Sequence, residues 1–281
     1  MPWAGIAFGM LDPHFEITRL NNGNQLNSSF SFDFHGEDGK NYCMVSDNLL
    51  EVIVQMFSLS PDSVVLQRPV EEVDPFFEGT WMKGFGILYH DQSQEPHRIS
   101  ILLNPAADRI GEQPFNATFD GVPMVALEAP GPVLWKSPDG LATVVREAGR
   151  INSLLVSISD LLEMEVVTDS EKELIADPPI HFLNFNFRNI TTTPSVHGFL
   201  GQMFAPGAIA ERLDMGTLEG LRHREYVEGT DDDYAASSLT EADCSFSRFG
   251  KGAENNDAGE LAGASAGLPH AVSSGRRLLR L

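Results

Sequence analysis

The sequence predicts an all-β protein, an antiparallel β-sandwich or barrel of about a dozen strands. Three observations lead to this prediction. Many short segments alternate apolar and polar residues with a period of two, which is typical of strands that bury one face. Turn signals separate these segments at near-regular spacing. Helical periodicity is scarce, and one of the best candidates, near residues 208–225, is interrupted by Gly216 and Gly220, so we expect only short helices there.

The clearest alternation involves phenylalanine. Segments 30–34, 115–119 and 183–187 place an apolar residue, in most cases Phe, at every second position, with polar residues between them. Successive strand side chains point to opposite faces, so each segment is predicted to be a strand with one buried face. Runs rich in Val, Ile and Leu predict further strands at 50–57, 62–67, 98–104, 122–129, 142–147, 151–158 and 164–167.

Three turns are predicted between these strands. Residues 35–41, HGEDGKN, contain the hairpin pair Asp38-Gly39, and a second Asp-Gly pair stands at residues 120–121. Asp-Gly tolerates the positive φ angles that two-residue hairpin turns require. SPDG at 137–140 places Pro at the second position of a tight turn, where its fixed φ is favourable.

Composition divides the chain into three parts. Residues 1–10 are predicted to be an N-terminal lead-in, residues 11–250 the β domain, and residues 251–281 a disordered tail. The tail is rich in Gly, Ala, Ser and Asn, without an aromatic residue to nucleate a core. It ends in RRLLRL, which is too short to form a stable helix alone.

Charge and hydropathy exclude several classes of function. The formal net charge is −21, from 40 acidic and 19 basic residues, so an interaction with nucleic acid or an anionic membrane surface is disfavoured. No stretch approaches the ~20 apolar residues that span a bilayer, so no transmembrane segment is expected. The first residues lack the basic and long apolar regions of a signal peptide, which leaves a cytoplasmic location open.

No catalytic or cofactor-binding residue is predicted. GASAG (263–267) matches the nucleophile-elbow pattern, but the strand that should precede the serine is missing. No phosphate-loop spacing occurs, and the eight histidines are too scattered to predict a transition-metal site. A hydrolase that uses carboxylates at unidentified positions remains one alternative.

The acidic run EGTDDDY (228–234) raises a second alternative, a calcium-dependent adhesion or assembly module. Asp231, Asp232 and Asp233 can supply the oxygen ligands that calcium prefers. The ligand spacing of an EF-hand is absent, however, and charge runs are usually solvated loops. We therefore expect no cofactor, and calcium binding at this acidic run is the alternative.

Two cysteines and three sequons could indicate whether the protein enters the secretory pathway. Cys43 and Cys244 are either bridged or two buried thiols, and the sequence alone does not decide between these states. Asn27, Asn116 and Asn189 begin N-x-S/T sequons and are candidate glycosylation sites if the chain enters the secretory pathway.

Six segments in order resemble the plant root cap family, also described as late-embryogenesis-abundant-related. They cover residues 11–250 and read DPHF, FDFHG, NYCMVSDNLLEVIVQMF, TWMKGFGILY, HFLNFNF followed by VHGFLGQMFAPG, and EYVEGTDDDYAASSLTEADCSFSRF. The same organisation is distantly similar to von Willebrand factor type D modules and to the carboxy-terminal part of inter-alpha-trypsin inhibitor heavy chains. Those modules are extracellular β-sandwiches.

The resemblance implies a non-enzymatic extracellular or cell-wall-associated module, structural or binding, with a protein or glycan partner. It carries over no catalytic residues. The family's closing segment has two cysteines, whereas this chain keeps Cys244 and has Ser247 at the second position. A Cys43–Cys244 bridge would instead join the first hairpin to the last segment and close a loop of about 200 residues, a stabilisation of ~4–5 kcal/mol in the chain-entropy model.

Overall fold

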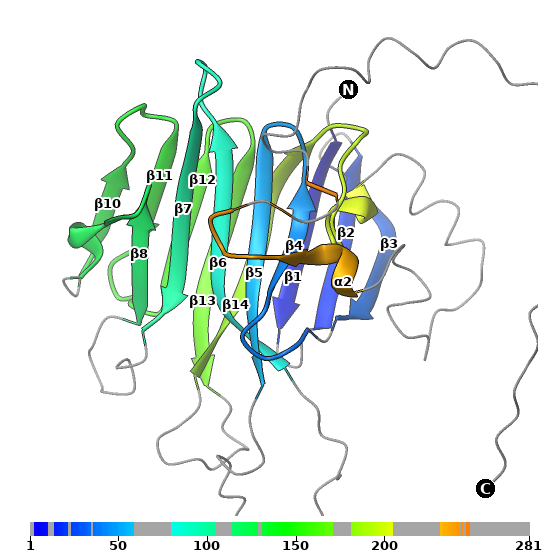
Figure 1. Ribbon diagram of the computed structural model, residues 1–281, viewed down its shortest axis with the longest axis horizontal. Helices are drawn as coiled ribbons and strands as arrows, with labels where there is room; N and C mark the ends of the chain where they lie inside the picture. The colour runs from blue at the N-terminus through cyan, green and yellow to red at the C-terminus, as the bar shows by residue number, and fades with distance from the viewer. Residues whose placement is uncertain are drawn as a thin grey trace, which may run out of the picture.

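The computed structural model describes residues 3–10, 14–21, 24–34, 36–58, 80–104, 114–128, 131–170, 181–204, 231–241, 243 and 246–247. These residues confirm the all-β fold: fifteen strands form one antiparallel hydrogen-bonded sheet. The sheet is curled so that its two halves lie face to face as layers, which Figure 1 shows. The predicted strand at 62–67, the predicted helices at 208–225 and the predicted tail lie outside the described residues.

The front sheet contains seven strands. In spatial order they are β9 (Val122–Pro123), β8 (Phe115–Phe119), β7 (Pro96–Leu103), β6 (Thr80–His90), β5 (Leu50–Ser58), β4 (Asn41–Ser46) and β15 (Ala235–Ala236). The back sheet contains eight strands, in the order β10 (Val133–Lys136), β11 (Ala142–Arg146), β12 (Ser153–Ile158), β13 (Leu162–Ser170), β14 (His181–Thr192), β1 (Trp3–Met10), β2 (His14–Asn21) and β3 (Asn24–Asp33).

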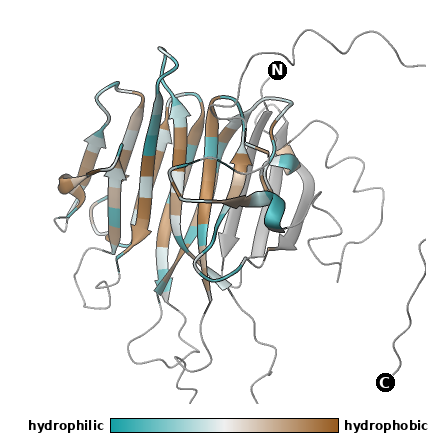
Figure 2. Cartoon of the chain, viewed as in Figure 1, coloured by the Kyte–Doolittle hydropathy of each residue, from teal (hydrophilic) through white to brown (hydrophobic). Residues whose placement is uncertain are grey.

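One residue pair, Leu183 of β14 with Met82 of β6, connects the two sheets by strand pairing. Aromatic side chains connect them through the core, since the ring centroids of Phe85 and Phe185 lie 5.6 Å apart. Figure 2 shows that hydrophobic residues follow the strands, while hydrophilic residues gather at the turns. The predicted alternation is confirmed in β8 and β11, where every second side chain is buried.

Two predictions about the chain's segments differ from the structure. Residues 3–10, expected as a lead-in, form β1, which pairs with both β14 and β2. Residues 122–129, expected as one strand, form the two-residue β9 and the 3-10 helix η3 (Val125–Leu127). The Met124 N–H still donates to the Ala117 carbonyl oxygen at 2.9 Å, and the chain then turns away from β8 into η3.

Two of the three turn predictions are confirmed, at Asp120-Gly121 and at SPDG (137–140), whereas Asp38-Gly39 does not form the predicted hairpin, because β3 pairs with β2 and β4 pairs with β5 and β15. Asp120 and Gly121 both have positive φ angles, 48° and 79°, as a two-residue hairpin turn of type I′ requires. Gly39 has a φ of 71° and Gly140 a φ of 75°, each in a predicted turn. The turns at 120–121 and 137–140 set the register of the strands that they join, and each places one aspartate, Asp120 or Asp139, beside His97.

Two inner strands of the front sheet depart from the alternation. All six residues of β4 are buried, and in β6 only Lys83 is exposed and His90 half-buried. The inner face of these strands packs on the core. Their outer face is covered by a segment near the C-terminal end, which Figure 1 draws in orange across β4, β5 and β6. The front sheet is therefore covered on part of its outer face as well as on its inner face.

Candidate functional site

The covering segment, here called the strap, comprises residues 231–247. It begins with the short helix α2 (Asp231–Tyr234) and continues as β15, whose Ala235 and Ala236 pair with Tyr42 and Asn41 of β4. Tyr234 is almost fully buried, and its hydroxyl accepts a 2.7 Å hydrogen bond from Gln202 of the 3-10 helix η4 (Gly201–Phe204). The strap thus enters as an added edge strand of the front sheet.

A groove in the front sheet receives the middle of the strap. Gly84 and Gly86 of β6 lie on the outer face, because Phe85 between them points into the core. A Cβ atom on Gly86 would overlap the backbone carbonyl of Leu239, and one on Gly84 would lie 3.0 Å from the Leu239 side chain. The two glycines therefore provide the space in which the strap crosses β6.

Apolar side chains line this groove. Leu239 is 8% exposed and forms a cluster with three fully or almost fully buried residues, Cys43, Ile53 and Leu88. This cluster is separate from the main core between the two sheets. The strap therefore completes a second, smaller core on the outer face of β4, β5 and β6.

Polar contacts hold the strap along its length. Asn41 Nδ2 donates to the carbonyl oxygen of Ser237 at 3.4 Å, and Arg98 Nε donates to that of Thr240 at 3.0 Å. Further along, Ser46 Oγ lies 2.9 Å from the carbonyl oxygen of Phe246. Each of these three groups contacts the main chain of the strap rather than its side chains.

The end of the strap lies over a buried carboxylate. Glu51 of β5 has no exposed surface, and its Oε1 accepts hydrogen bonds from Ser247 Oγ at 2.8 Å and Ser46 Oγ at 2.7 Å. The ring of Phe246 stacks on that of His197 at a centroid distance of 3.9 Å. His197 also pairs with Ser46 as an isolated β-bridge, so residues of the segment 196–204 support the strap from beneath.

The predicted cysteine and sequon residues occupy different environments. Cys43 is fully buried in the groove and is disulfide-bonded. Cys244, the only other cysteine of the chain, lies outside the described residues, between Asp243 and Phe246 of the strap. Asn116 and Asn189 are exposed. Asn27 lies in β3, and its side chain is outside the described part.

The acidic run proposed for calcium is only partly described. Asp231, Asp232 and Asp233 form the start of α2, where Asp232 is exposed and Asp233 half-buried. Within the described ranges, no three His, Cys, Asp or Glu side chains are grouped so as to hold a metal ion.

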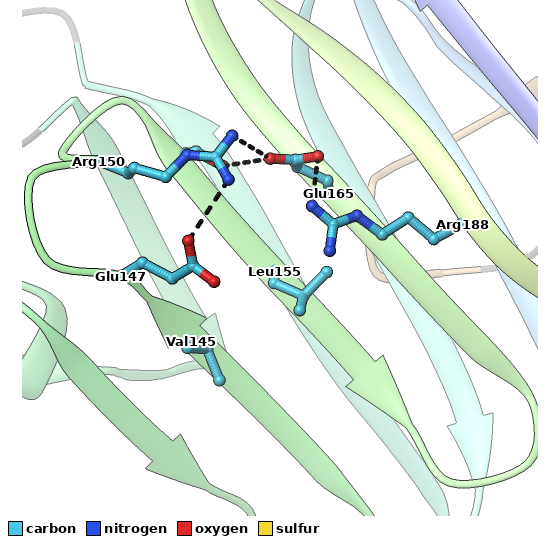
Figure 3. A pocket seen from close by; sticks show the side chains of 7 residues that line it. Val145, Glu147, Arg150, Leu155, Glu165 and Arg188 are labelled. Carbon is cyan, nitrogen blue, oxygen red and sulfur yellow. Dashed lines mark hydrogen bonds and ion pairs between the residues drawn. The ribbon is translucent and has the colours of Figure 1, made fainter.

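A charged cluster lies on the outer face of the back sheet, over β12, β13 and β14 (Figure 3). Glu165 of β13 stands between two arginines, with its carboxylate 2.8 Å from Arg150 and 2.9 Å from Arg188. Ser153 Oγ donates a third hydrogen bond to it at 2.8 Å. Burial opposes ionisation of Glu165, but these donors outweigh burial and lower its pKa.

The same cluster forms a shallow surface hollow. Val145 and Leu155 provide its apolar lining, and Arg150 also approaches Glu147 at 3.4 Å. Both arginine side chains remain partly exposed, at 48% for Arg150 and 38% for Arg188. The charges in the hollow compensate one another, and the contacts of Glu165 with Ser153 and Arg188 link β12, β13 and β14.

A second titratable cluster joins three turns at one end of the sandwich. His97 of β7 lies with its Nδ1 2.8 Å from Asp120 Oδ2, and its Nε2 lies 3.6 Å from Asp139 and 3.9 Å from Asp91. Tyr89 donates to Asp139 at 2.9 Å. Since Asp120 follows β8 and Asp139 follows β10, this cluster connects the front sheet to the back sheet.

The electrostatics of this cluster favour an ionised Asp139. Burial opposes its charge, but hydrogen bonds from Ser137, the Leu141 backbone and Tyr89, together with the charge of His97, lower its pKa. Burial raises the pKa of Tyr89, which therefore stays a neutral donor. The sequence offered no signal for this cluster, because Asp91, Asp120 and Asp139 each occupy an ordinary turn position.

No helix in the described part of the chain is long and apolar enough to cross a membrane. No protein-family model and no curated protein matches the sequence.

Proposed function

We propose that this protein is a secreted or wall-associated, non-enzymatic β-sandwich module with a structural or binding role, similar to the root cap proteins. The single observation that carries the proposal is the disulfide-bonded Cys43 beneath the strap. Structural disulfides persist in oxidising environments and are rare in the cytosol. The bond would stabilise the strap on the front sheet and protect it outside the cell.

The exposed sequons support an extracellular location. Asn116 of β8 and Asn189 of β14 are both exposed, so a glycan on either residue meets no packed core. Their sequon threonines, Thr118 and Thr191, are half-buried in the same strands. Glycosylation at these two positions is compatible with the fold, and it requires passage through the secretory pathway.

The charge of the chain indicates which partners it favours. A net charge of −21 repels acidic polysaccharides and attracts basic protein surfaces, an effect that salt weakens. We therefore expect an extracellular partner of the basic protein class in preference to an acidic glycan. Complementary charge speeds association and selects partners more than it adds affinity.

Fractionation and glycan mapping test this proposal. The protein from its native source is recovered from extracellular and cytosolic fractions, and its peptides around Asn116 and Asn189 are analysed by mass spectrometry with and without a glycosidase. We expect an extracellular protein with a glycan on at least one of the two asparagines. A protein found only in the cytosolic fraction and without glycans would refute the proposed location.

A further inference from the structure

The groove under the strap recognises an extended main chain. Two of its polar contacts, from Asn41 and Arg98, are hydrogen bonds to backbone carbonyl oxygens of the strap, and Ser46 Oγ lies 2.9 Å from a third. β15 adds to the edge of β4 by strand pairing. This is the recognition mode of β-strand addition, in which main-chain hydrogen bonds hold the added segment and pockets select its side chains.

Specificity comes from the positions of two strap side chains. Leu239 fills the space that Gly84 and Gly86 leave open, against Ile53 and Leu88. Tyr234 is buried beside Phe199, with ring centroids 6.2 Å apart, and receives the hydrogen bond from Gln202. An occupant therefore needs an aromatic residue and, five positions later, a leucine, and the strap of this chain has both.

The chain that precedes the strap is long enough for the strap to reach the groove of another molecule. Residues 205–230 separate η4 from α2, and 26 residues span up to about 85–95 Å when extended. A second copy of the chain presents the same groove and the same strap. Exchange of identical segments between copies keeps every contact of the groove and adds no new ones.

We propose that the groove also accepts the strap of a second copy of this protein, and that opening the Cys43 disulfide permits this exchange. A dithiol reductant supplies the electrons. Its thiolate attacks one sulfur of the bond, a mixed disulfide forms, and its second thiol displaces the protein thiol. The reductant ends as a cyclic disulfide and the protein as two thiols, Cys43 and its former partner.

Reoxidation then closes the bond within or between copies. A disulfide oxidant such as oxidised glutathione takes up the electrons of the two thiols and leaves as two reduced molecules. If the strap of one copy sits in the groove of another at that moment, Cys244 of the first copy is linked to Cys43 of the second. The product is a covalent strap-exchanged dimer.

Isotope mixing of the full-length protein tests the proposal. Heavy and light proteins are reduced with dithiothreitol, mixed at high concentration and reoxidised, and the linked peptides are identified by mass spectrometry without reduction. We expect peptides that join heavy Cys43 to light Cys244, and none when the reduction step is left out. Recovery of links within one isotope only, at the highest soluble concentration, would overturn the proposal.

Two variants show whether the groove directs the exchange. Leu239→Asp places a charge in the apolar groove, and we expect it to abolish the heavy–light links. The matched control Leu49→Asp changes a leucine that is 40% exposed and should leave them unchanged. Equal linking in Leu239→Asp and wild type would show that collision rather than the groove joins the copies.

A competing peptide keeps the test valid if Leu239→Asp does not fold. A synthetic peptide of residues 231–247 with Cys244→Ser is added in excess to the reduced wild-type mixture. We expect it to lower the yield of heavy–light links, and we expect the same peptide with Leu239→Asp to have no effect. Equal effects of the two peptides would overturn the assignment of the groove.

Discussion

The substitution Gly86→Ala tests the packing of the strap on the front sheet. The added methyl group would overlap the carbonyl oxygen of Leu239, which is backbone and cannot rotate away. The strap has to move outward at this point. The movement exposes Leu239, which is 8% exposed in the native structure, and weakens the bond from Arg98 to Thr240.

The size of the effect follows from these losses. Exposing a buried leucine costs ~1.5–3 kcal/mol, and losing a hydrogen bond costs ~1 kcal/mol. Replacing Gly by Ala in a strand returns ~0.5–1 kcal/mol through the lower entropy of the unfolded chain. We expect a net loss of about 1.5–3.5 kcal/mol in the free energy of unfolding.

Urea unfolding of the oxidised protein measures this loss, and hydrogen exchange of the strap amides shows where it occurs. Gly84→Ala is the matched control, because its methyl group meets only side-chain atoms of Leu102 and Leu239 and one carbonyl at 3.3 Å. Side-chain ends can rotate, so we expect a smaller loss from Gly84→Ala. A Gly86→Ala protein that is as stable as wild type, with an equally protected strap, would refute the packing account.

Three further predictions concern charged groups and the partner. The neighbours of Glu165 lower its pKa in the folded protein below its pKa in the unfolded chain. Ionised Glu165 therefore stabilises the fold fully at pH values above the unfolded pKa, and this stabilisation is lost as the pH falls through the folded pKa. Glu165→Gln should therefore flatten the loss of melting temperature with acid, and an unchanged acid slope would contradict this. Arg146 is buried and donates to the carbonyl oxygens of Gly131 and Leu127. Arg146→Met leaves these acceptors unsatisfied, so we expect it to lower the free energy of unfolding in urea by ~2–3 kcal/mol. A loss under ~0.5 kcal/mol would show that other donors satisfy the two carbonyl oxygens. A basic extracellular protein should bind the full-length chain at low ionic strength and lose affinity as salt is added, and binding that does not respond to salt would argue against a charge-selected partner.

The sequence predicted the strands whose alternation is regular. Segments 115–119 and 183–187 were found because buried apolar residues, most of them phenylalanine, recur at every second position, and Asp120-Gly121 was found because its turn needs positive φ. Strand β1 was missed because Gly5 and Gly9 lower its apparent strand propensity. The ladder with β14 and β2 overrides that propensity.

The strap and its groove could not be predicted, for a physical reason. The groove consists of two glycines and Leu88 of β6 with apolar residues of β4 and β5, and its occupant Leu239 follows about 150 residues later. Glycines in a strand indicate a bulge or a close approach, but they do not indicate what approaches. The cluster around His97 was missed for a related reason, since its aspartates also serve as turn residues.

Disulfide mapping tests the central claim most directly. Protein from the native source is alkylated during extraction, digested without reduction and analysed by mass spectrometry. The account predicts a linked peptide pair that carries Cys43 and Cys244, which separates into two peptides on reduction. Recovery of both cysteines as alkylated thiols in the native protein would contradict the bonded strap and the extracellular function that we derive from it.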